Sequence, residues 1–310
     1  MDQPRLGDAF APLSIARCPP GVAQRRSGHG GPPREVRSPL RQARLPCPAR
    51  PAGDARGVIR AGGGRARALH LWEGLTMPLH LRAGPGDVAP IALLAGDPAR
   101  TIRLAGALEG ARLYNENRGL VGYTGQHHGR PVSVQTTGMG GPSAAIVVEE
   151  LADLGVRTVI RLGTCGAIAP SVAVLDLVIA TAAVGADGTT RQYTGGEPFA
   201  PVADFAVTRA LFESGESVSR PVHAGLLVSQ DAFYRQPESW EAWRRRGVLA
   251  VEMEAAAIFT VALQRGLRAG TACLVVDRVD DRSSWASDDA IAEATADLIE
   301  LGLAAVERLR

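Results

Sequence analysis

The stretch TVIRLGTCG, residues 158–166, shows the pattern from which the fold class follows: a short apolar run that ends among glycines and polar groups. Such a run is typical of a β-strand whose carboxyl end opens into a loop. The stretches IALLAG at 91–96 and VSVQT at 132–136 have the same apolar character. In α/β folds ligands bind at the carboxyl ends of strands, so these loops are the first candidates for a site.

Helical patterns alternate with strands over the rest of the chain. Helices are expected at 143–154, with Ser143 near the N-cap, and at about 203–215, 238–246, 254–265 and 288–309. Further strands are expected at about 175–184, 223–229, 249–253 and 271–277. This alternation predicts an α/β domain with a mainly parallel or mixed sheet. No stretch approaches the roughly 18 apolar residues of a membrane-spanning helix, so no membrane partner is expected.

Residues 1–76 differ in composition from the rest of the chain. They hold 13 arginines and five acidic residues, together with 10 of the 21 prolines and 11 of the 36 glycines. A chain of this kind buries too little apolar surface to fold, so the extension is predicted to be disordered and the domain to span 77–310.

Three interpretations of the extension compete: a basic arm for an acidic partner such as nucleic acid, an organelle transit peptide, and translation from upstream of the true start. The third is preferred, because LWEGLTM at 71–77 back-translates to a purine-rich sequence shortly before a start codon. Met77 is then the expected first residue.

The number and spacing of the cysteines indicate the redox state of the compartment in which the protein works. Cys18, Cys47, Cys165 and Cys273 form no CxxC pair. This spacing argues against a disulfide scaffold and against a zinc finger, and it predicts a reducing, cytoplasmic setting.

The first polar cluster, Gly96-Asp97-Pro98-Ala99-Arg100, follows a predicted strand and leads into a helix. Free backbone N–H groups and an arginine within one helical turn would suit an anion. An ordinary turn with a surface arginine explains the same pattern, so both interpretations stay open.

The second cluster is Arg161 to Gly166. An arginine within an apolar strand is costly to bury unless it meets a carboxylate or an anion, so Arg161 is either a structural ion pair or a ligand contact. The Thr164 hydroxyl and the two glycines favour a ligand contact. Cys165 could be a nucleophile, but no histidine partner is near it in the sequence, and a pocket-lining role is preferred.

The third cluster places Glu252 and Glu254 on either side of Met253, between an apolar strand and an apolar helix. Two buried carboxylates need partners. A glycosidase would use them as general acid and base, whereas a sugar-binding site would use them as acceptors for vicinal hydroxyls. Helix capping explains at most one of them.

The fourth candidate is Asp277, at the end of the apolar strand CLVV. A protonated aspartic acid in this place can donate its proton to a leaving group, and an aspartate that caps the next loop is the alternative. Asp280 and Asp281 follow without a histidine nearby, which indicates a solvated turn rather than a metal site.

Several motifs in chain order resemble the nucleoside phosphorylase family, which includes hexameric purine nucleoside phosphorylases, uridine phosphorylases and methylthioadenosine phosphorylases. They are GDPAR at 96–100, Arg118 before GYTG at 122–125, TGMGGPS at 137–143, RLGTCG at 161–166 and VEME at 251–254. The resemblance runs from about Met77 to the C-terminus, and MPLH at 77–80 resembles the family's opening.

The resemblance implies a single domain with a distorted central barrel of mixed strands flanked by helices, assembled as a trimer of dimers with shared active sites. It implies that Asp277 protonates N7 of a purine while phosphate attacks the sugar, with no metal or organic cofactor. The implied phosphate ligands are Gly96, Arg100, Arg161 and Thr164, with Arg118 from the adjacent subunit. The implied nucleoside contacts are Cys165, Gly166, Phe233, Glu252, Met253 and Glu254, with His80 from the neighbour.

The chain departs from the family pattern near Asp277. The arginine that assists the catalytic aspartate in many bacterial purine enzymes is absent from the corresponding stretch, SSWASDDA at 283–290, and Val276 stands where serine is frequent. Arg278 or Arg282 is the candidate substitute.

The order FYRQP at 233–237, without a following insert, favours purine nucleosides over uridine. Phosphorolysis of uridine or methylthioadenosine remains the alternative within the family. A hydrolytic nucleosidase would not need three arginines, and a non-catalytic nucleoside- or nucleic-acid-binding protein would require the basic extension to be genuine.

Overall fold

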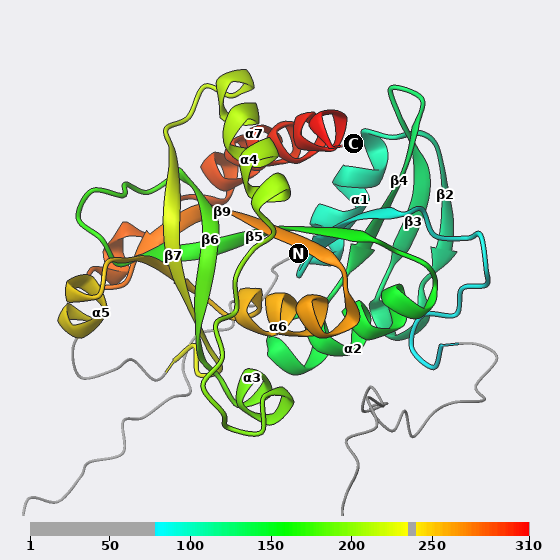
Figure 1. Cartoon of the computed structure of the whole chain (residues 1–310). Coiled ribbons are helices and arrows are strands. Elements are labelled where there is room, and N and C mark those ends of the chain that lie inside the picture. The colour runs from blue at the N-terminus through cyan, green and yellow to red at the C-terminus, as the bar shows by residue number, and fades with distance from the viewer. Residues whose placement is uncertain (1–77, 235–239, 310) are drawn as a thin grey trace, which may run out of the picture. The chain divides into compact units, whose positions relative to one another are not determined.

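The computed structural model describes residues 78–234 and 240–309, in which strands and helices alternate as predicted (Figure 1). The predicted disordered extension and the expected start at Met77 lie outside the described residues. Among the helices of the described part, none is long and apolar enough to cross a membrane.

The described residues form one nine-stranded mixed sheet, in the order β2-β3-β4-β1-β5-β8-β7-β6-β9. Because β9 also pairs with β5, the strands β5, β8, β7, β6 and β9 close into a barrel. The predicted fold class, an α/β domain with a barrel-like mixed sheet flanked by helices, is therefore confirmed. The strands are β1 (Ile91–Ala95), β2 (Glu109–Asn115), β3 (Gly122–His127), β4 (Arg130–Thr136), β5 (Thr158–Ala167), β6 (Leu177–Ala186), β7 (Val222–Gln230), β8 (Val248–Glu252) and β9 (Arg268–Arg278).

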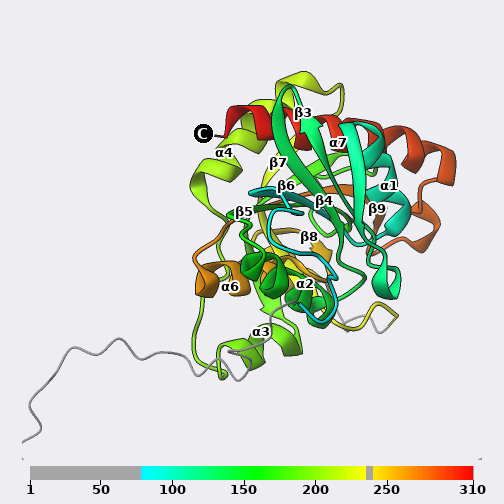
Figure 2. The same cartoon turned by 90° about the vertical axis from the view of Figure 1, so that its right-hand side faces the viewer.

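Helices cover the sheet on two sides, with α2, α3 and α6 on one side and α4 and α7 on the other in both views (Figures 1 and 2). The helices are α1 (Pro98–Gly106), α2 (Gly141–Asp153), α3 (Gly188–Tyr193), α4 (Phe205–Glu213), α5 (Glu241–Arg245), α6 (Ala255–Arg265) and α7 (Asp288–Arg308). Strand β5 is buried on both faces: Val159 packs in the cluster with α2 and α6, and Ile160 packs in the cluster with α1, α4 and α7. This double burial explains the continuous apolar run at the start of β5.

Several local features differ from the sequence prediction, which did not expect strand β3 or helix α3. Helix α2 begins at Gly141, two residues before its predicted start, with Gly140 as N-cap; Ser143 lies near the N-cap as predicted, and its hydroxyl donates to the carbonyl of Thr137. Strand β2 was not predicted, because five of its seven residues are exposed and no apolar alternation marks it.

Candidate active site

Arg161, on β5, is the centre of a buried charge cluster. Its side chain is 5% exposed, its Nε lies 3.1 Å from Glu252 Oε2, and its Nη2 lies 2.5 Å from Glu254 Oε2. Burial alone lowers the pKa of Arg161, but the two glutamates outweigh burial and the net pKa is raised. Arg161 is therefore an ion-pair partner and stays charged.

The two glutamates are held by backbone groups as well as by Arg161. Glu252 accepts hydrogen bonds from the backbone N–H groups of Glu254 and Ala255 and from the Ser229 hydroxyl. Burial raises the pKa of Glu252, while Arg161 and these donors act in the opposite direction. Glu252 thus caps helix α6 as the alternative interpretation predicted, and it also pairs with the arginine.

Glu254 connects the same arginine to a glycine loop. Its Oε1 accepts from the N–H of Gly140, 2.5 Å away, at the start of α2. Gly138 and Gly140 have φ angles of 70° and 88°, a conformation that favours glycine. The TGMGGPS segment at 137–143 therefore contacts the Arg161 charge cluster through Gly140.

The turn from Gly96 to Arg100 lies next to Nη1 of Arg161, the guanidinium nitrogen that faces neither glutamate. A Cβ on Gly96 would come within 3.1 Å of the Gly138 carbonyl and 3.9 Å of Arg161 Nη1. Asp97 caps α1 by accepting from the N–H groups of Ala99 and Arg100, as in an ordinary turn. The close approach to Gly138 explains why the position before this cap is glycine.

Arg100 is not a surface arginine. Its Nη1 donates to the Leu162 carbonyl at 3.2 Å, and its Nε is buried without a hydrogen-bond partner in the described structure. Burial and the charge of Arg161 lower the pKa of Arg100. A buried donor next to a second arginine is costly unless an anion binds there, so this is where an anion fits best.

Asp277 lies on β9, beside the carboxyl-terminal end of β5. The Arg161 guanidinium lies over Gly163, where a Cβ would meet it at 2.7 Å, and the Asp277 carboxylate lies over Gly166, where a Cβ would meet Oδ1 at 2.8 Å. Gly163 and Gly166 are three residues apart, or roughly 10 Å at the rise of a strand. A β-bulge between β5 and β9 sets Asp277 opposite Gly166. The Arg161 guanidinium and the Asp277 carboxylate therefore both lie beside the carboxyl-terminal half of β5.

Cys165 is buried in the core, with 3% of its surface exposed. A hydrogen bond with Cys273 and burial raise the pKa of the Cys165 thiol well above its usual value. A protonated, buried thiol is a poor nucleophile, so the structure argues against covalent catalysis by Cys165. Thr164 and Met253 are half-buried beside the cluster.

Three predicted residues lie outside the Arg161 cluster. His80 bonds through its Nδ1 to Glu150 Oε1 at 2.7 Å. Arg118 is exposed and has a φ of 58°, a conformation that is uncommon for residues other than glycine. Phe233 is 52% exposed and packs edge-on against Tyr234.

Ser229, near the end of β7, also belongs to the charge cluster and was not identified from the sequence. Its hydroxyl donates to Glu252 and accepts from the N–H of Ala256. A serine at the end of a strand gives no local signal of this role, because both partners lie far along the chain.

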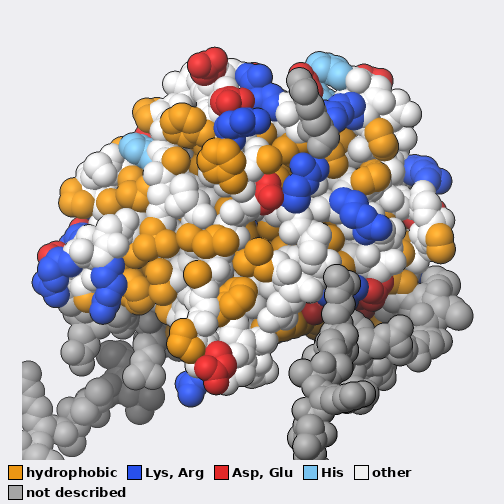
Figure 3. Space-filling model, viewed as in Figure 1, with side chains coloured by type: hydrophobic (Ala, Val, Ile, Leu, Met, Phe, Trp, Pro, Cys, Tyr) orange, Lys and Arg blue, Asp and Glu red, His pale blue; other side chains and the backbone are white. Residues whose placement is uncertain are grey.

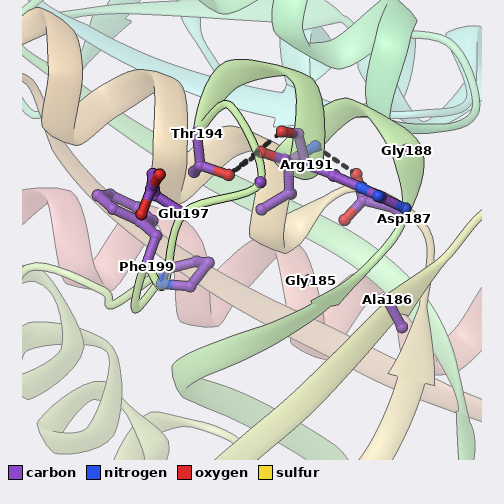
Figure 4. A pocket seen from close by; sticks show the side chains of 11 residues that line it. Gly185, Ala186, Asp187, Gly188, Arg191, Thr194, Glu197 and Phe199 are labelled. Atoms are coloured by element: carbon purple, nitrogen blue, oxygen red, sulfur yellow. Dashed lines mark hydrogen bonds between the residues drawn. The ribbon is translucent and has the colours of Figure 1, made fainter.

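A separate hollow of about 590 Å³ lies beside α3, with Asp187 and Arg191 at one end and Glu197 and Phe199 at the other (Figure 4). None of the predicted site residues lines it. Gly188, which lines this hollow, donates its backbone N–H to Asp231, two residues before Phe233.

Comparison of the sequence with known proteins shows its family. Residues 90–307 match the family described as the phosphorylase superfamily. The chain is 44% identical over 205 residues to the DeoD-type purine nucleoside phosphorylase of Geobacillus kaustophilus, covering 66% of this chain and 87% of that protein. It is 37% identical to the guanosine phosphorylase of Halorubrum lacusprofundi, covering 71% and 92%, and 38% identical to the uridine phosphorylase of Thermococcus kodakarensis, covering 73% and 86%. The chain belongs to the phosphorylase superfamily.

Proposed function

We propose that the protein catalyses the phosphorolysis of purine nucleosides to the free base and (deoxy)ribose 1-phosphate, as an enzyme of nucleoside salvage. The observation that carries this proposal is the buried, unpartnered Nε of Arg100 beside Arg161, which together suit a phosphate ion. Relatives named purine nucleoside phosphorylase support the purine as the base.

In the proposed reaction, a phosphate oxygen attacks C1′ of the nucleoside and the bond from C1′ to the base breaks. The electron pair of that bond passes to the purine, and Asp277 donates its proton to N7. Glu254, together with Glu252 and Met253, positions the ribose, while the arginines balance the charge of the phosphate. The chemistry proposed needs no metal ion and no organic cofactor.

The decisive experiment measures base release by the full-length protein from inosine, adenosine, methylthioadenosine and uridine, each with and without phosphate. Phosphate-dependent release from the purine nucleosides, lost in Asp277→Ala, is the expected result. Release without phosphate would refute phosphorolysis in favour of hydrolysis.

The phosphate contact is tested separately with Arg100→Met. Loss of one charge-assisted hydrogen bond costs about 1.5–3 kcal/mol, so the KM for phosphate should rise about 10- to 100-fold. Arg103→Met is the matched control, because Arg103 lies on the same helix and is exposed. An unchanged phosphate KM in Arg100→Met would place the anion elsewhere.

Uridine phosphorolysis is the second candidate, because one relative at 38% identity is named uridine phosphorylase. The same assay distinguishes the two. A clear preference for uridine over inosine would favour this candidate and remove the role proposed for Asp277 at N7.

A homo-oligomer, a trimer of dimers with shared sites, completes the proposal, since exposed Arg118 lies outside the cluster of its own chain. Mixing and refolding inactive Arg118→Ala with inactive Asp277→Ala should restore activity if each site draws on two chains. Absence of restored activity from assembled mixed oligomers would refute the shared site. We propose a cytoplasmic location, in keeping with the free thiols of Cys165 and Cys273.

A nucleic-acid partner is not part of the proposal. Residues 77–310 hold 21 arginines and 27 acidic residues, and on the face shown in Figure 3 the two kinds are interspersed. Binding to a phosphate backbone is favoured by a basic surface instead.

A further inference from the structure

The hairpin between β3 and β4 lies against the C-terminal end of α7, on the outside of the domain (Figures 1 and 2). His127 ends β3, His128 begins the turn, and Glu307 lies in the last turn of α7. These three side chains come from segments about 180 residues apart in the chain. They serve no purpose in the reaction proposed above.

The three side chains converge on one point. His127 Nε2 lies 2.8 Å and His128 Nδ1 lies 3.0 Å from the same atom, Glu307 Oε1. The ligand atoms of the three residues all lie within 4.8 Å of one another. A tetrahedral zinc ion with bonds of about 2.0–2.1 Å holds its ligand atoms about 3.3 Å apart, so a small side-chain movement would admit the ion.

The two imidazole rings are stacked, with centroids 4.3 Å apart and an interplanar angle of 16°. The stacked rings each present a nitrogen to the same oxygen of Glu307. The lone pair of an imidazole nitrogen is the group that binds a metal ion.

The backbone around the cluster is fixed by another residue of the hairpin. Arg130 donates to the carbonyls of Val306, Glu307 and Leu309, and so ties the turn to the end of α7. His128 and Gly129 have φ angles of 48° and 74°, the conformation of a two-residue type I′ turn. Asparagine is the residue preferred in the first of these positions, so the histidine stands where turn geometry alone does not select it.

We propose that His127, His128 and Glu307 form a zinc site that joins the β3–β4 hairpin to α7. Two imidazole nitrogens and one carboxylate oxygen are ligands that Zn²⁺ accepts, and three protein ligands leave a position for water. Mg²⁺ and Ca²⁺ prefer sites made of oxygen atoms, so the site discriminates against them. The ion bridges two segments that are far apart in the chain and binds only the folded state, so it stabilises the domain.

The test uses the full-length protein without an affinity tag, freed of metal by a chelator. A calorimetric titration with Zn²⁺ should show one binding site per chain. Added Mg²⁺ should not compete with Zn²⁺ for this site. Co²⁺ in place of zinc should give the intense visible absorption of four- or five-coordinate cobalt. Zinc should also raise the thermal midpoint.

His128→Asn is the decisive variant, because asparagine suits the turn and removes one ligand. It should bind zinc at least about tenfold more weakly and lose the cobalt spectrum, while keeping its fold and its phosphorolysis activity. Glu307→Gln should behave alike. His223→Gln is the matched control, since His223 pairs with Asp176 elsewhere and its loss should change nothing in the titration.

Either of two results would overturn the proposal. One is zinc binding of equal strength in wild type and His128→Asn, which would place the ion elsewhere. The other is the weak spectrum of hexaaqua cobalt in the wild-type protein, which would leave the cluster as a hydrogen-bonded surface contact only.

Discussion

Replacing Arg161 by methionine tests the charge cluster most directly. The substitution leaves Glu252 and Glu254, which are 0% and 6% exposed, without their common cation. Removing one partner of a buried ion pair costs about 3–5 kcal/mol. For a domain of this size, a loss of 1 kcal/mol lowers the melting temperature by about 2–4 °C, so we expect a decrease of about 6–20 °C.

Lysine at the same position separates charge from geometry. The lysine ammonium lacks the planar fork through which Arg161 contacts both carboxylates with separate nitrogens, and Glu252 keeps its other donors, so we expect the loss of one charge-assisted hydrogen bond of about 1.5–3 kcal/mol. The expected decrease in melting temperature is about 3–12 °C. The series should therefore run wild type, Arg161→Lys, Arg161→Met in order of falling stability.

The assay is thermal unfolding followed by circular dichroism, with steady-state kinetics at varied phosphate concentration on the same preparations. Arg157→Met is the matched control: Arg157 is exposed just before β5, and we expect a change of less than about 0.5 kcal/mol. Arg161→Met with the melting temperature of the wild type would refute the view that this ion pair holds the site together.

Three further predictions follow from single residues. Gly166→Ala should lower kcat about 100-fold, because the new Cβ would lie 2.8 Å from Asp277 Oδ1 and displace the carboxylate; Gly106→Ala, with nothing within 4 Å, should be neutral in the same kinetic assay. Cys165→Ser should keep phosphorolysis, because the pKa of this buried thiol is raised, and complete loss of kcat in a folded variant would contradict us. Burial and Glu149 raise the pKa of Tyr193 to about 12, above its value of about 10 in the unfolded chain, so its contribution to stability is complete below pH 10 and is lost as the pH rises through 12. Melting temperatures of Tyr193→Phe should therefore fall less between pH 10 and 12 than those of the wild type, and parallel curves would contradict this.

Local pattern predicted the elements that are buried. Strands with a continuous apolar run, such as the start of β5, and helices with apolar spacing, such as α6 and α7, lie within a few residues of their predicted bounds. Exposed β2 and the short helix α3 escaped prediction, because neither has an apolar face that the sequence could reveal.

The sequence by itself determined that Arg161, Glu252 and Glu254 need partners, because charged groups in apolar surroundings cannot be buried alone. Only the tertiary structure decided that they are one another's partners, since Arg161 and Glu252 are 91 residues apart in the chain. Pairing between β5 and β9 closes the barrel, and its bulge sets Asp277 opposite Gly166. Strand register of this kind depends on long-range packing and not on local periodicity, which is why the site residues could be named from the sequence but their geometry could not.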